Sequence, residues 1–235
     1  MINDHTLELT YLSKDMEEGF PGNLTVSVVY SITEENTFKC EYHATTDKKT
    51  VINLTNHAFY NLNGEGSGNI LNHKLQIFAN EFTPVDNNLI PTGIQESVSE
   101  TPFDFSQPTT VGIHINDPSE QLQNGMGYDH NFVLSGARED GLIYAARVIG
   151  DKSGITMDVF TKEPGLQFYS GNFMRSENTL KGGSKDDFRT AFAMETQHYP
   201  DSPNQPSFPS TVLEEGQVYH SVTQYKFSTI DFETA

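Results

Sequence analysis

The sequence predicts an all-β fold, a sandwich formed by one domain that spans residues 1–235. Apolar and polar residues alternate with a period of two over several segments, which is typical of half-buried strands. Clusters of Gly, Asn, Asp and Pro separate these segments, and no long amphipathic helix lies between them. Regular spacing of this kind favours a sandwich over a fold in which strands and helices alternate.

The clearest alternation covers residues 24–32, where every second side chain is apolar. Residues 38–44 repeat the pattern, and the polar residues 34–36 between the two segments indicate a hairpin. One short helix is expected near residues 119–123, after an irregular segment rich in Pro, Asp and Thr. The other predicted strands are residues 6–12, 73–79, 81–85, 143–149, 155–161, 165–170, 189–195 and 219–227.

The composition limits the possible partners. With 14 basic and 32 acidic residues the formal net charge is -18, so nucleic acid and anionic membrane surfaces would repel the chain. A neutral small molecule fits better. Cys40 is the only cysteine, which excludes an intrachain disulfide and favours a small buried side chain. Neither a secretory signal nor a membrane span is recognisable, so a soluble, cytoplasmic chain is expected.

One histidine, His57, lies in the segment VINLTNHAFYNL at residues 51–62. A period of two places His57 on the polar face with Asn53 and Thr55, and the following Asn-Gly pair supplies a turn. We therefore expect His57 near a strand end, on a face that could line a cleft. An isolated histidine is nevertheless more often structural or solvated than catalytic.

Glu195 is the second candidate, because it ends a face whose preceding members, Ala191 and Ala193, are small. Small side chains leave room for a ligand above a carboxylate, although a glutamate at the solvated end of a strand would show the same pattern. Other polar candidates lie in YDHNF, EPGLQFYSGNF and the Pro-rich loop after Glu195; they are Asp129, His130, Gln167, Tyr169 and His198.

A metal centre is not expected from these candidates. No His-x-His pair occurs among them, and Glu195 and His198 are three residues apart on an extended segment, so their side chains point to opposite faces. One histidine with one or two carboxylates is instead a set suited to proton transfer.

Four segments together resemble the aldose 1-epimerases, the galactose mutarotase family: NLTNHAFYNL, DHNF, EPGLQFYSGNF and METQHYPDSPNQPSFP stand in the family's order and spacing. The resemblance runs from about residue 7 to residue 227. It implies an antiparallel β-supersandwich that interconverts the α and β anomers of hexoses such as galactose and glucose, without a cofactor or metal. Residues 1–235 would form the C-terminal two-thirds of the family domain.

The resemblance also implies roles for particular residues. His57 matches the general acid and Glu195 the general base. Asp129 matches a residue that binds sugar hydroxyls, and Gln167 and Asn56 are further expected substrate contacts. Two other functions stay open: a non-catalytic carbohydrate-binding module or inactive fragment, and a glycoside hydrolase that uses Glu195 and Asp129 as its carboxylate pair.

Family members carry a further region before the point where this chain starts, with an arginine in an NRI-type motif and a second histidine in an LHGG-type motif. Neither motif occurs here. The resemblance therefore implies an N-terminally incomplete sandwich, with Met1 internal to a longer protein or the chain one piece of it. Such a sandwich is expected to expose sheet edges, to associate through them and to catalyse weakly.

Overall fold

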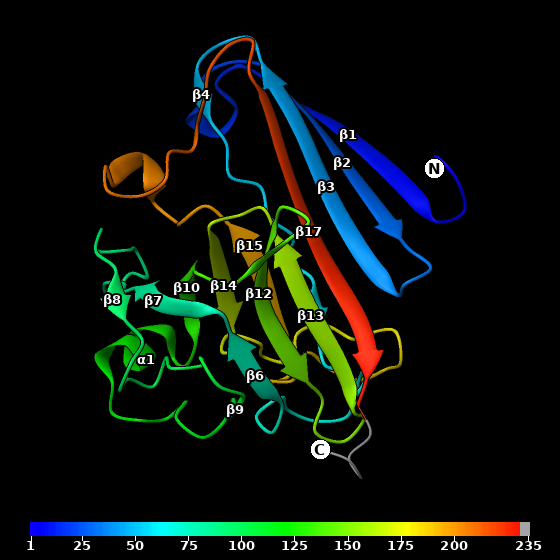
Figure 1. Cartoon of the computed structure of the whole chain (residues 1–235), viewed down its shortest axis with the longest axis vertical. Helices are drawn as coiled ribbons and strands as arrows, with labels where there is room; N and C mark the ends of the chain where they lie inside the picture. The colour runs from blue at the N-terminus through cyan, green and yellow to red at the C-terminus, as the bar shows by residue number, and fades with distance from the viewer. Residues whose placement is uncertain (231–235) are drawn as a thin grey trace.

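The structure, a computed structural model, describes residues 1–230. Nearly all of its regular structure is β, and every strand pair in the described residues is antiparallel, as predicted (Figure 1). The larger sheet contains, in spatial order, β1 (Thr6–Ser13), β2 (Leu24–Ile32), β3 (Thr37–Thr46), β17 (Val218–Thr229), β13 (Ile155–Thr161), β12 (Leu142–Ile149), β6 (Lys74–Ile77) and β9 (Thr109–Thr110), with β11 (Arg138–Glu139) beside β12.

A second sheet packs against part of the first. Its strands are, in spatial order, β5 (Phe59–Tyr60), β15 (Phe192–Gln197), β14 (Gly165–Tyr169), β10 (Asp129–Leu134), β7 (Ala79–Thr83) and β8 (Glu96–Ser97). A short ladder joins β4 (Thr50–Val51) to β16 (Val212–Leu213). The helical segments are η1 (Glu17–Gly19), α1 (Glu120–Gly125) and η2 (Ser202–Asn204), and none in residues 1–230 is long and apolar enough to cross a membrane.

The main core lies between the two large sheets. On the larger sheet, alternate residues of β3, β17, β13, β12 and β6 turn inward and are buried, and alternate residues of β10, β14 and β15 meet them from the second sheet. Hydrogen bonds join β17 to β15 across the core, from the Tyr225 hydroxyl to the Met194 carbonyl at 2.9 Å and between the hydroxyls of Thr223 and Thr196. In β3 the period of two in the sequence thus corresponds to one buried and one more exposed side, whereas all six residues of β15 are buried.

Most predicted strands agree with the structure. β2 and β13 have the predicted residues. β1, β3, β12, β14 and β17 differ by one or two residues at one or both ends, and α1 lies where the helix was expected. The predicted strand at 189–195 begins three residues too early, because Arg189 has a left-handed φ of 58° and belongs to the preceding loop. Residues 73–85 pass from the larger sheet to the smaller one at Phe78, so the break between strands falls there rather than at residue 80.

β1 and β2 extend beyond the second sheet (Figure 1). Their apolar face continues the inner face of the larger sheet, because Leu9 pairs with Val28 and Val28 with Tyr42. Leu9 is 50% exposed and Ile32, at the end of β2, is 63% exposed, whereas Tyr42 is buried. This end of the larger sheet therefore has an apolar face without an opposing layer in the described residues.

Candidate active site

The outward face of the second sheet carries a row of polar side chains. Strand register places Gln167 of β14 between Asn131 of β10 and Glu195 of β15. Asp129 lies diagonally to Gln167, and its Oδ1 accepts a hydrogen bond from Gln167 Nε2 at 2.8 Å. The alternate residues of the same strands point into the core, so period-two alternation alone separates the polar row from the apolar one.

The segment that carries His57 is held beside β15 at two points. On one side, Asn53 makes a pair of hydrogen bonds with the backbone of His198, from Asn53 Nδ2 to the carbonyl at 2.9 Å and from the amide to Asn53 Oδ1 at 3.0 Å. On the other side, Phe59 of β5 pairs with Ala193. Residues 52–58 are not a strand, but these anchors keep them antiparallel to β15.

Continuing the register of the Phe59–Ala193 pair by two residues places His57 opposite Glu195. The Nε2 atom of His57 lies 3.4 Å from Oε1 of Glu195. The His57 side chain is 51% exposed and that of Glu195 only 12%, so the imidazole lies at the mouth of the site and the carboxylate at its floor. The structure thus brings together the two residues that the sequence suggested for proton transfer.

Burial dominates the electrostatics of the carboxylates. Loss of hydration raises the pKa of Glu195 to about 7; the neighbouring His57 opposes this shift and the charge of Asp129 adds to it. Burial also raises the pKa of Asp129, whereas its hydrogen bond from Gln167 lowers it. A carboxyl whose pKa lies near neutrality can accept and return a proton in one catalytic cycle, which suits Glu195 to act as a general base.

Aromatic rings form one wall of the site. The ring of Phe59 lies 4.9 Å from that of His57, and the ring of Tyr169 lies 6.3 Å from it at a steep angle. Tyr169 stacks in turn on Phe173 at 6.2 Å. The three aromatic rings also line a cavity of about 1050 Å³ beside the site, whose walls include the loop at residues 173–187 but neither His57 nor Glu195. Sequence reasoning singled out Tyr169 but missed Phe59 and Phe173, although both stand within or beside the polar motifs.

Three other polar candidates make hydrogen bonds or ion pairs within the chain. Asn56 Oδ1 accepts a hydrogen bond from the amide of Ala58 at 3.1 Å, which shapes the turn that carries His57. His198 Nδ1 lies 2.6 Å from Oε2 of the buried Glu163. His130 is buried in the core, which lowers its pKa to about 3, and its Nδ1 accepts a hydrogen bond from the amide of Asp129. The last contact helps to orient Asp129.

Comparison with solved structures first defines the class of fold. The chain matches the crystal structure of an aldose epimerase homologue from C. elegans with a TM-score of 0.86 and 28% sequence identity, over 97% of this chain and 67% of that one. It matches a galactose 1-epimerase from Lactobacillus acidophilus NCFM with a TM-score of 0.82 and 24% identity, over 97% and 65% of the two chains. The architecture is therefore that of the galactose mutarotases, as predicted.

Sequence comparisons then identify the family. The family model for aldose 1-epimerase matches residues 2–226. A galactose mutarotase from Bos taurus is 42% identical over 224 residues, which are 94% of this chain and 63% of the relative. An aldose 1-epimerase from Escherichia coli (strain K12) is 39% identical over 227 residues, which are 96% and 64%. The chain belongs to the aldose 1-epimerase family and spans somewhat less than two-thirds of the length of these relatives.

Proposed function

We propose that this chain is an aldose 1-epimerase that interconverts the α and β anomers of hexoses such as galactose and glucose. The observation that carries the proposal is the meeting of His57 Nε2 and Glu195 Oε1 at 3.4 Å on an open polar face, with the pKa of Glu195 near 7. Relatives with 42% and 39% identity are named galactose mutarotase and aldose 1-epimerase, which supports the same function. Residues 1–235 would act as one domain.

The reaction explains why an acid and a base should stand so close together. Opening a pyranose ring removes the proton of the C1 hydroxyl and adds one to the ring oxygen, and both oxygens are bonded to the same carbon. Glu195 takes the hydroxyl proton while protonated His57 gives its proton to the ring oxygen; the C1–O5 bond breaks and the C1 carbonyl forms. Rotation about C1–C2 and the reverse proton transfers then close the ring on the other face.

The neighbouring groups fit the other requirements of this reaction. Asp129 and Gln167 would bind sugar hydroxyls, with Asn56 as a further contact. Phe59 and Tyr169 offer apolar surface to the C–H groups of a sugar ring. No step in this scheme requires a nucleophile, a cofactor or a metal.

The net charge and the single cysteine bear on the partners and the location of the chain. The formal net charge of -18 favours a neutral sugar over nucleic acid or an anionic membrane as the ligand. Cys40 is the only cysteine and is buried, which suits a reducing cytoplasmic environment. We therefore propose a cytoplasmic sugar isomerase.

Polarimetry tests the proposed function directly. Anomerically pure α-D-galactose or α-D-glucose should lose its excess rotation faster in the presence of the chain, in proportion to the chain concentration. Sugar binding without acceleration would instead indicate a carbohydrate-binding module or an inactive fragment. Release of free sugar from an aryl galactoside would indicate a glycoside hydrolase, and the proposal would then be wrong.

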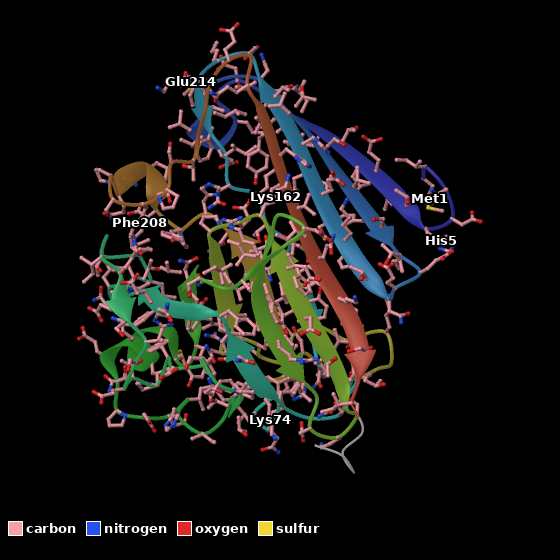
Figure 2. All side chains as sticks on the ribbon, in the orientation of Figure 1. Met1, His5, Lys74, Lys162, Phe208 and Glu214 are labelled. Carbon is pink, nitrogen blue, oxygen red and sulfur yellow. The ribbon has the colours of Figure 1, made fainter. Side chains whose placement is uncertain are left out.

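His57→Gln is expected to reduce the chain-dependent rate to below about one hundredth of the parent, since a positioned acid typically contributes about 10² to 10⁴. Glutamine retains a polar side chain but cannot donate a proton as an acid. His5→Gln serves as the control, because His5 is an exposed histidine immediately before β1 (Figure 2). If His57→Gln raised only KM and left kcat unchanged, His57 would be a sugar contact and the acid would lie elsewhere.

The rate is also expected to depend on pH in a particular way. Glu195 must be ionised to act as the base, and its pKa in the folded chain is about 7. The acidic limb of the kcat/KM profile should therefore rise through about pH 7 rather than near the usual glutamate pKa of about 4.3. A limb centred between pH 4 and 5 would contradict the base role of a buried Glu195.

A further inference from the structure

A second group of imidazoles lies on the larger sheet, away from the proposed sugar site. His43 of β3 is paired directly with His220 of β17, and the two rings stack with centroids 4.5 Å apart and planes 13° apart. Glu41 lies two residues before His43, on the same side of the strand. Its Oε1 atom is 2.9 Å from Nε2 of His220 and 3.4 Å from Nε2 of His43.

The geometry of this cluster meets two requirements of a ligand set. One imidazole nitrogen from each histidine and one oxygen of Glu41 all lie within 4.8 Å of one another. The cluster is also accessible, because the side chains of His43, His220 and Glu41 are 45%, 35% and 25% exposed. The alternate residues of β3, Cys40 and Tyr42, point into the core, so the three polar groups lie on the outer face.

We propose that His43, His220 and Glu41 form a binding site for a divalent transition-metal cation such as Zn²⁺, Ni²⁺ or Cu²⁺. Two imidazole nitrogens and one carboxylate oxygen suit these metals, whereas Ca²⁺ and Mg²⁺ prefer oxygen ligands alone. The three protein ligands leave the remaining coordination positions for water. The formal net charge of -18 adds a general attraction for cations.

The position of the ligands on the sheet favours binding. The hydrogen bonds between β3 and β17 fix the backbone of His43 against that of His220, so bringing the rings together costs little conformational entropy. A bound metal would link two strands that are far apart in the sequence. Metal that binds the folded chain more tightly than the unfolded chain raises the stability of the fold.

Two lysines set a limit on the affinity. Lys162 follows β13 (Figure 2), and its Nζ lies 2.9 Å from Nδ1 of His220. An ammonium group can only donate, so Nδ1 of His220 accepts and the neutral ring carries its proton on Nε2. A metal at Nε2 requires the opposite tautomer, so Lys162 must move away when the metal binds. Lys39 competes with a metal for the carboxylate of Glu41, because its Nζ lies 2.5 Å from Oε2 of Glu41.

The test is a calorimetric titration of the untagged chain with Zn²⁺, in a buffer that does not chelate metals. We expect one equivalent of Zn²⁺ to bind and to raise the melting temperature. His43→Gln and His220→Gln should each weaken binding by at least about tenfold, since even the loss of a residue that only orients a ligand costs about 10- to 100-fold. Lys162→Met should tighten binding severalfold, because it frees Nδ1 of His220.

His114→Gln is the matched control, because His114 is an exposed histidine with one carboxylate, that of Asp117, at 2.8 Å. It should bind Zn²⁺ like the parent. Glu41→Gln keeps both imidazoles and should show intermediate affinity. Absence of one-equivalent binding in the parent, or parent-like binding by both folded histidine variants, would overturn the proposal. Circular dichroism of each variant verifies the fold. The polarimetric assay tests the mutarotase proposal independently of metal binding.

Discussion

Glu195→Gln is expected to abolish chain-dependent anomer interconversion while leaving the fold intact. The substitution removes the base but hardly changes the volume of the side chain, and Glu195 sits on a regular strand. A positioned base typically contributes about 10² to 10⁴ in rate, so the residual rate should fall below about one hundredth of the parent. Polarimetry on α-D-galactose measures it. A variant that kept more than about a tenth of the parent rate would exclude Glu195 as the base.

The same variant should be more stable than the parent at high pH, which separates loss of the base from loss of the fold. The pKa of Glu195 is raised from 4.5 to about 7 by burial, so the folded chain binds an extra proton between these values. The contribution of Glu195 to stability is therefore fully present below about pH 4.5 and is lost as the pH rises through about 7. At pH 8, Glu195→Gln should gain about 1 to 3 kcal/mol in free energy of unfolding.

Thermal or denaturant unfolding at pH 8 and pH 4.5 measures this gain. We expect it to disappear at the lower pH, where the parent carboxyl is already neutral. Glu139→Gln, at an exposed glutamate of β11, should show no such gain at pH 8. An unchanged or lower stability of Glu195→Gln at pH 8 would mean that burial does not destabilise the ionised form of Glu195.

The strands with one buried face are the part of this fold that local sequence predicts well. In β13 the alternation of side chains coincides with the observed strand because one face packs on the core. In β2 it also coincides, although Val26 alone is buried there, because β2 is paired with β1 and β3 along both of its edges. Alternation also places Ala193 and Glu195 correctly on the outward face of β15, although the predicted start of that strand is wrong. Arg189 takes a left-handed conformation there, and its guanidinium binds the carbonyl of Met126. Neither feature follows from a period of two.

The contact between His57 and Glu195 could not be derived from local pattern. It depends on Asn53, whose amide binds the backbone of His198, a residue 145 positions away. In the sequence, only the resemblance to a family links the motif that carries His57 to the motif that carries Glu195. The near-neutral pKa of Glu195 likewise arises from burial by the surrounding strands. Amino-acid composition does not predict this shift. His198 and His130 both lie in polar motifs of the sequence. In the structure His198 pairs with Glu163, whereas His130 is buried in the core.

The apolar face of β1 and β2 is expected to make the chain self-associate in solution. In the described residues β1 pairs on one side only, with β2, so the backbone groups on its other edge are open to another strand. Leu9 on this face is 50% exposed, and covering its exposed half would contribute about 1 kcal/mol per subunit. We propose a second copy as the occupant, with the two β1 edges paired antiparallel about a two-fold axis near Leu9, so that the Leu9 side chains of the two copies pack against each other. The net charge of -18 opposes this contact, so added salt should strengthen it.

Leu9→Lys should weaken the association by at least about tenfold. A symmetric contact loses the buried leucine twice and gains two positive charges that repel each other. A loss of about 1.4 kcal/mol already corresponds to a factor of ten. Sedimentation equilibrium over a range of concentration and salt measures the constant. Ile113→Lys is the matched control: Ile113 is 60% exposed but lies in the irregular segment before α1, so its loss should leave the association unchanged. If the parent chain stays monomeric at every concentration and salt level, this face does not bind a second copy. A parent-like constant for Leu9→Lys would instead place the contact elsewhere on the chain.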